Sequence, residues 1–568
     1  MNLYSRFSIL RRLIWILVAQ VFLGCIPLAS VTALAATTGT KVVILEFHGM
    51  KQGIIAKNLR NLPHFRKLIN GPHDCRAYTY LPSVLTIIPG GSVPDITAMY
   101  TGRYPRTTGI VSTTWFDRKA CKTRNPISYS QQRINKILRH NHVKTLFDYL
   151  RGAGRKSMTA MVMVTKGADW SLKSGIFFWG NAATLGFIHN GRWIPDSPYT
   201  DRKTLSAFLT GHLMSYHKSL VGVFKRYDTI PDVMTLEFLG TDLISHYPPG
   251  DLREGHSSIA EIQEDYTIRV LDPLLGRLIQ VLRKIGCYQD TIFFLISDHG
   301  FSQIFKHVRN KAVDQSLRKV FRLPGWGIGK QQADAVIMPG ASTKDIYLRN
   351  RRTGNWMDPP RLLQDIKPAV DLLLHNRELQ GCLNTLVIRQ YPGERSDGPP
   401  ESRDGWWVFD WRNYLAASKL KRDADFLDAL RPLAAIRNRF NLYGYVMRGL
   451  QMQYTRETAP DIKLINKKGY YFEPDPGKYG HHGSYYRDDC LVSFWIAGPG
   501  LARIIPGRRV LTRTASILDL IPMVMHVLGI PPPAGLDGRD PLATLDTNEG
   551  DQRVTPAPSC SKKGRAAQ

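Results

Sequence analysis

Four short groups of histidine and acidic residues, far apart in the chain, carry side chains that can bind metal ions. They lie at 46–49 (Glu-Phe-His-Gly), 242–246 (Asp-Leu-Ile-Ser-His), 297–300 (Ser-Asp-His-Gly) and 480–483 (Gly-His-His-Gly). Imidazole and carboxylate are the ligands that a hydrolytic zinc site needs. Ser92 lies between the first two groups, and a serine hydroxyl becomes a good nucleophile when a metal ion lowers its pKa. The ordered set therefore predicts a metal-dependent hydrolase with a serine nucleophile.

Some of these residues also have a purely structural interpretation. Ser92 is a favoured helix N-cap, and with Pro94 in the first turn it would only start a helix at 95–100. Asp242 and His246 are four residues apart, so a helical turn would put both on one face, where they could form a surface ion pair. Both alternatives are open at this point.

Short apolar runs lead into two of the four groups, as buried strands of a parallel sheet do. Such runs lie at 42–45 and 292–296, and a third lies at 491–496. Helical patterns are found between them, for example at 145–150 and 270–282. Open α/β sheets hold their active sites at the carboxyl ends of the strands. The chain is therefore expected to be an α/β enzyme with a mostly parallel central sheet.

The N-terminus has the pattern of an export signal. Three arginines within the first 12 residues precede an apolar run at 13–23, and a small-x-small cleavage pattern ends at Ala35. We therefore expect a signal peptide at 1–35 and an exported protein, periplasmic or secreted. Lipoprotein anchoring at Cys25 fits less well because apolar sequence continues beyond it, and an uncleaved anchor is a third alternative. No later stretch is long and apolar enough to span a bilayer.

The rest of the sequence divides by composition. Residues 36–545 are the expected catalytic domain, and 301–470, rich in Arg, Lys, Trp, Pro and Gly, are an expected insertion or cap subdomain within it. Residues 546–568 are polar and basic and are predicted to be a disordered tail. Six cysteines follow the signal, which permits disulfides in an oxidising compartment without showing their pairing.

The chain is strongly basic, with 76 Lys and Arg against 47 Asp and Glu and a formal net charge of +29. A hydrophobic content of 43% is typical of a globular protein and excludes general disorder. The positive charge favours an anionic partner, either a small phosphate ester as substrate or an anionic membrane surface for peripheral association. There is no specific nucleic-acid motif, and the sequence does not indicate an oligomeric state.

The order and spacing of the motifs resemble the alkaline phosphatase superfamily, and most closely its type I phosphodiesterase/nucleotide pyrophosphatase group. The resemblance covers about 41–542, apart from most of the insertion. Segment 92–95 is similar to the T-x-P-N nucleophile motif and leads to Thr-Gly and Tyr-Pro at 101–105. The other matches are D-x-x-G-H at 242–246, S-D-H-G at 297–300 and the final His-Gly at 482–483.

This resemblance implies an alkaline-phosphatase-like three-layer αβα sandwich and two divalent metal ions, of which zinc is the expected one. One ion would be held by Asp242, His246 and His482. The other would be held by Asp298, His299, Ser92 and a residue that follows the first strand. Ser92 would attack phosphorus and form a covalent phospho-enzyme, as in a phosphodiesterase or pyrophosphatase. His481 is an alternative to His482, because the sequence does not show which ring faces inward.

Two residues depart from the family pattern. His48 stands where the family has an Asp before Gly; imidazole binds zinc well, so we keep His48 as the expected ligand, with Glu46 a weaker candidate. Asp95 stands where nucleotide-cleaving members have an Asn that donates to a phosphoryl oxygen. We assign Asp95 to substrate binding, although an ionised Asp would repel that oxygen.

The departures leave other functions open. A phosphonate hydrolase would use a similar two-metal site. A non-catalytic anion-binding homologue is the alternative from another class, motivated by His48 and Asp95. A sulfatase is disfavoured, because Ile96 stands where its maturation motif requires Arg.

Overall fold

The computed structural model describes residues 39–71, 76–126, 131–172, 186–189, 192–195, 201–202, 216–218, 224–226, 230–325, 327–391, 405–417, 422–436, 443–472, 477–543 and 551–553. The expected signal peptide at 1–35, with Cys25, and most of the tail at 546–568 lie outside these residues. Within the described part of the chain, no helix is both long and apolar enough to cross a bilayer.

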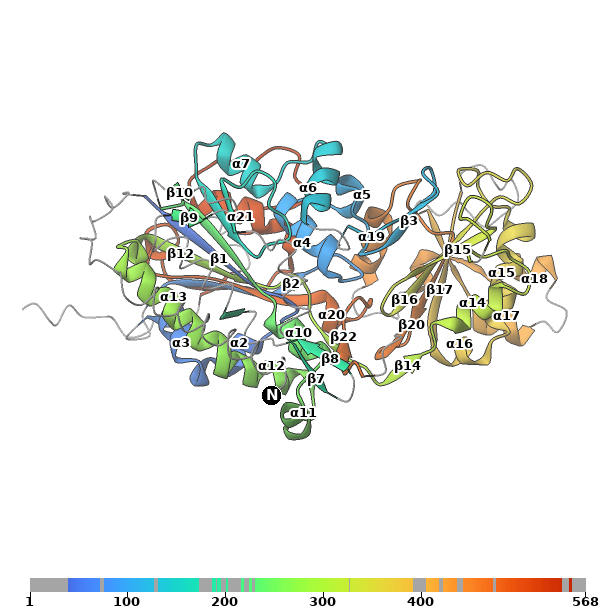
Figure 1. Ribbon diagram of the computed structural model, residues 1–568, viewed down its shortest axis with the longest axis horizontal. Coiled ribbons are helices and arrows are strands. Elements are labelled where there is room, and N and C mark those ends of the chain that lie inside the picture. Colours follow the sequence, from blue (N-terminus) through green and yellow to red (C-terminus); the bar gives the residue numbers. More distant parts are fainter. Residues whose placement is uncertain are drawn as a thin grey trace, which may run out of the picture. The chain divides into compact units, whose positions relative to one another are not determined.

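A ten-stranded sheet forms the centre of the fold (Figure 1), with the order β26-β24-β2-β23-β12-β1-β11-β5-β6 and β25 paired to β2. At its middle, β1 (Lys41–Phe47) pairs in parallel with both β11 (Val233–Phe238) and β12 (Thr291–Ile296). β23 (Leu491–Ala497) runs antiparallel to β12. The three apolar runs of the sequence are thus strands of one mostly parallel sheet, as predicted.

The outer strands of this sheet are shorter on average than the central ones. They are β2 (Tyr78–Leu85), β5 (Ser157–Ala160), β6 (Trp170–Leu172), β24 (Arg508–Leu511), β25 (Ala515–Ser516) and β26 (Asp551–Arg553).

Helices cover both faces of the sheet, which explains why β1 is apolar at nearly every position. Val42 and Ile44 belong to one hydrophobic core, and Val43 and Leu45 belong to a second. The first core includes α4 (Ser92–Thr101), α6 (Gln131–His140), α7 (Leu146–Gly152) and α21 (Leu520–Val527). The second includes α2 (Ile54–Asn58), α3 (Pro63–Asn70), α12 (Ile259–Tyr266) and α13 (Asp272–Lys284). The two groups lie above and below the sheet in Figure 1, so the three-layer fold is confirmed.

A second, antiparallel sheet of six strands lies within 301–470, with the order β15-β16-β20-β17-β18-β19. Its strands are β15 (Ala335–Pro339), β16 (Thr343–Leu348), β17 (Leu383–Arg389), β18 (Trp406–Phe409), β19 (Leu430–Pro432) and β20 (Ile462–Asn466). α14 (Lys311–Leu317), α15 (Lys367–Leu374) and α16 (Arg377–Cys382) share a separate hydrophobic core with it. We propose that this sheet and its helices form the cap subdomain.

The described cysteines are all free thiols. They are Cys121, Cys287, Cys382 and Cys490. Cys75 and Cys560 lie outside the described residues, so the structure contains no disulfide within its described part.

Candidate active site

The carboxyl ends of β1 and its two parallel neighbours lie side by side and lead into the predicted metal-binding groups. In the sheet register, Glu46 on β1 is opposite Ile296 on β12 and Glu237 on β11. His48 and Asp298 each lie two residues beyond this level, just past the ends of the adjacent strands β1 and β12. The register therefore brings the first and third groups together, although about 250 residues separate them in the chain.

Ser92 is the first residue of α4, and its side chain does not cap that helix. The N-cap is Gly91, in extended conformation, and the helix begins three residues before the expected 95–100. The Ser92 Oγ lies 3.0 Å from Nε2 of His48 and 3.0 Å from Nε2 of His299. The capping interpretation is therefore wrong, and the hydroxyl lies between two imidazole rings at a helix N-terminus.

Asp298 completes a first donor set with His48, Ser92 and His299. Its Oδ2 lies 3.4 Å from Nε2 of His48 and 3.3 Å from Nε2 of His299. Its Oδ1 accepts a hydrogen bond of 2.9 Å from the Gly49 amide. One carboxylate oxygen is thus held by the backbone while the other faces the two imidazole rings.

The Gly300 position explains why the third group ends in glycine. A Cβ at this residue would lie 2.0 Å from the Asp488 carbonyl oxygen, so no other side chain fits there. The Gly300 amide also donates to the Asp489 carbonyl oxygen over 2.8 Å. His299 Nδ1 donates to the Gly300 carbonyl over 2.9 Å, which leaves the Nε2 lone pair of His299 directed at Ser92.

A second donor set consists of Asp242, His246 and His482. Asp242 and His246 lie on one face of α10 (Gly240–His246), which follows β11. Nε2 of His246 and Nε2 of His482 each lie 3.5 Å from the same Asp242 oxygen, Oδ1. His246 Nδ1 donates to the Gly480 carbonyl over 2.9 Å, so its Nε2 faces the carboxylate. His246 is buried and Asp242 is partly buried, so the two residues lie within the site and do not form the surface ion pair that their spacing alone allows.

The two rings of the fourth group have different surroundings. His482 stacks on His299 with ring centroids 3.8 Å apart, which joins the second donor set to the first. His481 Nδ1 accepts the His482 backbone amide over 2.8 Å, and its Nε2 lies 3.3 Å from the Lys478 ammonium. Both nitrogens of His481 therefore already have partners, which favours His482 as the ring that faces Asp242.

A family model described as type I phosphodiesterase/nucleotide pyrophosphatase matches residues 42–485, which includes both donor sets and Ser92. The chain belongs to the type I phosphodiesterase/nucleotide pyrophosphatase family. It is therefore a phosphoric ester hydrolase, and metal dependence is typical of this family. No curated protein sequence matches the chain significantly.

Solved structures of the family share the fold. An inactive variant of murine ectonucleotide pyrophosphatase/phosphodiesterase 5 in complex with AMP is similar, with a TM-score of 0.53 and 13% identity over 89% of this chain and 99% of that one. The human protein of that name is similar with a TM-score of 0.51 and 14% identity over the same shares. At this identity the comparison establishes the alkaline-phosphatase-like architecture of the phosphodiesterase family.

The electrostatics of the two donor sets suit cations. Burial lowers the pKa of His246 well below its ordinary value, and burial together with the nearby His299 does the same for His482. Neutral rings offer lone pairs to a metal. Burial opposes charge on His48, but the Asp298 carboxylate and the hydrogen bond to Glu237 raise the pKa of His48 well above its usual value. A proton on that ring is thus stabilised by the same carboxylates that would attract a metal ion.

Two buried carboxylate oxygens that lack hydrogen-bond partners indicate whether the site can hold metal ions. Oδ2 of Asp298 and Oδ1 of Asp242 are buried and accept no hydrogen bond from any residue that the structure describes. A buried carboxylate oxygen without a partner is costly unless a cation neutralises it. Each donor set contains one of these two oxygens together with imidazole nitrogens. The described side chains that could hold an ion together form three overlapping groups, namely His246-His481-His482, His48-Asp242-His299 and Glu46-His48-Asp298. Their imidazole and carboxylate donors suit a divalent ion that prefers nitrogen and oxygen ligands.

Asp95, predicted to bind substrate, has a different environment from the one expected. The side chain is fully buried, and its Oδ1 accepts the Ile87 amide over 3.0 Å while its Oδ2 accepts the Gly91 amide over 2.7 Å. Burial and the charge of Asp298 raise the pKa of Asp95 well above its usual value. Both oxygens of Asp95 thus accept amides of the loop that precedes Ser92, and the substrate-binding role stays a prediction.

Two buried glutamates lie behind His48. The weaker candidate Glu46 accepts a hydrogen bond of 2.7 Å from the Tyr100 hydroxyl, and burial raises the pKa of this carboxyl well above its usual value. Glu237 accepts from His48 Nδ1 over 3.1 Å, and sequence reasoning did not identify it. The signal that could have found Glu237 is a lone acidic residue in the apolar run 233–238, just before Asp242.

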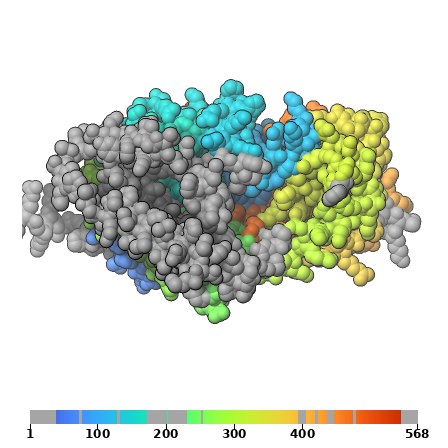
Figure 2. Space-filling view, in the orientation of Figure 1, coloured from blue at the N-terminus to red at the C-terminus, as the bar shows by residue number. Residues whose placement is uncertain are grey.

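A cavity of about 320 Å³ adjoins the donor sets. Its lining includes Gly91 and His482 from the site, residues 111–114, and Asp345 and Lys463 from the second sheet. Figure 2 shows a small orange-red area from the C-terminal part of the chain. It lies between a blue surface from an N-terminal part and a yellow-green surface from the middle of the chain. Gly91 and His482 therefore border a cavity that residues of the second sheet also line.

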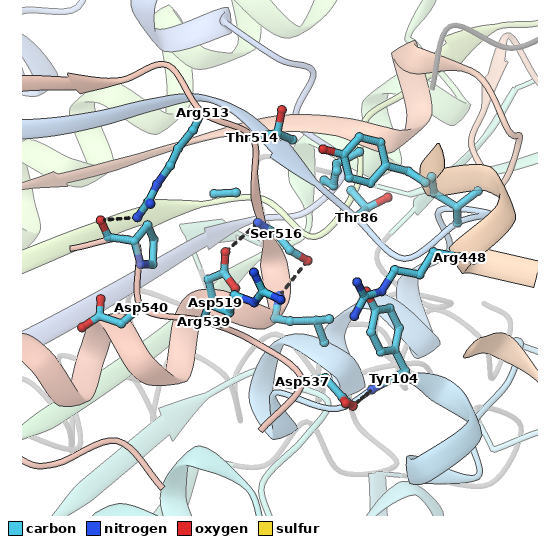
Figure 3. Close-up of a pocket in the computed structure, with 17 residues that line it drawn as sticks. Thr86, Tyr104, Arg448, Arg513, Thr514, Ser516, Asp519, Asp537, Arg539 and Asp540 are labelled. Atoms are coloured by element: carbon cyan, nitrogen blue, oxygen red, sulfur yellow. Dashed lines mark hydrogen bonds between the residues drawn. The ribbon is translucent and has the colours of Figure 1, made fainter. Parts of the chain in front are cut away.

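A larger cavity, of about 460 Å³, lies elsewhere and contains none of the predicted site residues (Figure 3). Arg448, Arg513 and Arg539 line it with three carboxylates. Arg513 donates to the Pro541 carbonyl, and Arg448 lies over the Tyr104 ring. Its three arginines are exposed, and none of the described groups that could hold a metal ion lies among its lining residues.

Proposed function

We propose that the protein is an exported, two-metal phosphodiesterase or pyrophosphatase that uses Ser92 as its nucleophile. The observation that carries this proposal is the position of the Ser92 hydroxyl, 3.0 Å from imidazole nitrogens of both His48 and His299 at the first residue of a helix. A helix N-terminus also favours the phosphoryl group, through its free amides and its dipole. Zinc is the proposed ion because the donors are imidazole and carboxylate.

The proposed ligands divide as the donor sets do. His48, Ser92, Asp298 and His299 would hold one ion, and Asp242, His246 and His482 would hold the other. Two divalent ions bound there would lower the pKa of the attacking hydroxyl and offset the charge on the phosphoryl and leaving oxygens.

In the proposed reaction, Ser92 Oγ forms a bond to phosphorus as the bond from phosphorus to the leaving oxygen breaks. The product of this step is a phosphoester of Ser92 and a free alcohol or phosphate. The serine proton leaves with the departing alcohol or phosphate. Water then attacks phosphorus on the side opposite to Oγ, the Oγ–P bond breaks, the phosphate product is released, and a proton from the water restores the Ser92 hydroxyl. The buried Asp95 keeps Gly91 in place throughout, so that the serine stays at the start of its helix.

A small anionic phosphate ester, including a nucleotide, is the proposed substrate. The murine relative binds AMP. The expected repulsion between Asp95 and a phosphoryl oxygen loses its basis, since both carboxylate oxygens of Asp95 accept backbone amides. The net charge of +29 favours an anion and allows peripheral contact with an anionic membrane surface. Export, to the periplasm or outside the cell, rests on the signal pattern at 1–35.

The test is zinc-dependent hydrolysis of a nitrophenyl phosphodiester by the wild type, Ser92→Ala and the control Ser83→Ala, a serine outside both donor sets. We expect the wild type and the control to turn over the substrate and Ser92→Ala to lose nearly all activity. Acid-quenched wild type should carry one phosphoryl group on the peptide that contains Ser92. If Ser92→Ala and the wild type were equally active on diester, monoester and phosphonate substrates, Ser92 would not be the nucleophile.

A further inference from the structure

We infer that Glu237 is a positioning residue that fixes the ring and the tautomer of His48, and through His48 controls metal binding beside Ser92. The inference rests on the proposed function, because it concerns the same site. It assigns a role to a residue that is not itself within the first donor set. Its basis is the chain of contacts from Glu237 through the two nitrogens of His48 to Ser92.

The sheet places Glu237 behind His48 with little freedom. β1 and β11 are parallel neighbours in which Glu46 pairs with Glu237 and Phe47 with Phe238. The His48 amide extends this pairing by donating to the Phe238 carbonyl over 2.9 Å. Both side chains are almost completely buried, with relative exposures of 3% for His48 and 0% for Glu237. Water therefore cannot replace Glu237 as the partner of the ring.

The hydrogen bonds determine which nitrogen of His48 carries the hydrogen. Glu237 Oε1 lies 3.1 Å from His48 Nδ1, and an ionised carboxylate can only accept. Nδ1 must then donate, so in the neutral ring that metal binding requires, the Nε2 lone pair points toward the Ser92 Oγ at 3.0 Å. Ligand histidines in metal sites are commonly oriented by a carboxylate on the other ring nitrogen in this way.

The second carboxylate oxygen of Glu237 also has a partner, so replacing one oxygen by the NH₂ group of glutamine would change the hydrogen bond to His48. Oε2 accepts a hydrogen bond of 3.1 Å from the Met163 backbone amide. A glutamine at 237 has only one acceptor atom, its carbonyl oxygen, and the Met163 backbone amide can only donate. The glutamine oxygen must therefore turn to Met163, and its NH₂ group must face His48 Nδ1.

The consequence for His48 is a change of tautomer. With an NH₂ group opposite it, Nδ1 has to accept, so the hydrogen moves to Nε2 and points at Ser92. An Nε2–H cannot bind a metal ion. The Glu237→Gln variant thus keeps the volume and the hydrogen bonds of the native pair but removes the lone pair that faces the site. A residue needed only for packing would not give this result.

The experiment compares Glu237→Gln with Thr235→Val, a matched control on the same strand and the same face. The Thr235 hydroxyl is buried and has no hydrogen-bond partner among the described residues. The first readout is zinc affinity, measured by competition with a chromophoric chelator, and thermal unfolding of the metal-free proteins serves as the check on folding. We expect zinc binding at one site to weaken by about 10- to 100-fold in Glu237→Gln and to be unchanged in Thr235→Val.

The second part of the experiment repeats the change in a His48→Asp background. An aspartate at 48 can bind a metal directly and has no ring for Glu237 to orient. Adding Glu237→Gln to His48→Asp should therefore alter zinc affinity by less than about twofold. Should Glu237→Gln bind zinc as the wild type does, or lose the same affinity in both backgrounds, the positioning role is disproved. If the single variant loses zinc as expected while the wild type hydrolyses no phosphoester, the positioning role stands and the proposed function fails.

Discussion

The Oγ of Ser92 and Nε2 of His299 lie 3.0 Å apart, although 207 positions separate the two residues in the chain. The two residues belong to different elements: Ser92 begins α4, and His299 follows β12. Their contact depends on the pairing of β12 with β1 and on the packing of α4 against the same sheet. This relationship is the centre of the candidate site, and the following predictions test the residues around it.

His482 and His481 should differ in their effect on metal content. We expect His482→Ala to reduce bound zinc from about two ions per chain to about one, because one of the three side-chain donors of the second set is lost. His481→Ala should retain its zinc, since its nitrogens bond to the 482 amide and Lys478. Metal analysis of the purified variants is the measurement. The reverse pattern would make His481 the ligand.

Asp95→Asn should destabilise the protein without improving its use of nucleotides. Two backbone amides donate to the Asp95 carboxylate, and an asparagine can accept only one of them. We expect a loss of about 1–3 kcal/mol in the free energy of unfolding, measured by urea denaturation, together with a lower kcat. Unchanged stability with higher activity on a dinucleotide would instead indicate that Asp95 faces the substrate.

Asp201 should make stability depend on pH. Burial raises the pKa of Asp201 to about 7, although the Tyr266 hydroxyl and the Gly240 amide both donate to its carboxyl. The unfolded value is near 4, so the native state binds the proton more tightly. The stabilisation from the protonated form is complete below about pH 4 and is lost as the pH rises to about 7.

The measurement for Asp201 is the difference in unfolding free energy between the wild type and Asp201→Asn, recorded from pH 4 to pH 8. Relative to the wild type, the variant should become more stable by up to roughly 4 kcal/mol over this range, since it cannot ionise. Other titrating groups cancel in the difference. A difference that does not change with pH would show that Asp201 titrates normally.

Removal of metal ions should lower both activity and stability. A bound ion would satisfy the buried oxygens of Asp242 and Asp298 that have no hydrogen-bond partner, and these oxygens meet the imidazole rings only in the folded chain. At free zinc of about 100 times Kd, binding would stabilise the fold by roughly 2.7 kcal/mol per site. We expect a chelator to lower the thermal midpoint and abolish phosphodiester hydrolysis, and added zinc to restore both. An unchanged thermal midpoint and full activity after dialysis against the chelator would contradict the prediction that the protein depends on metal ions.

Much of the fold follows from local sequence patterns. The apolar runs at 42–45 and 292–296 predicted buried parallel strands, because a strand covered on both faces needs apolar residues at successive positions. The helical pattern at 145–150 corresponds to α7, which Thr145 begins with a capping box. The second sheet was not predicted, since antiparallel strands scattered from 335 to 466 form only through pairing between distant segments.

The sequence by itself determined the chemistry that is possible here, because the residue types at Ser92, Asp242, His246, Asp298, His299 and His482 are encoded directly. Only the tertiary structure decided how these groups are used. In the folded chain, Asp95 accepts a backbone amide of its own loop, and His481 accepts the neighbouring backbone amide. Glu237 bonds to the nitrogen of His48 that faces away from Ser92. The physical reason is that an imidazole or carboxylate has two polar ends. Which end faces the site depends on the partner that distant strands bring to the other end.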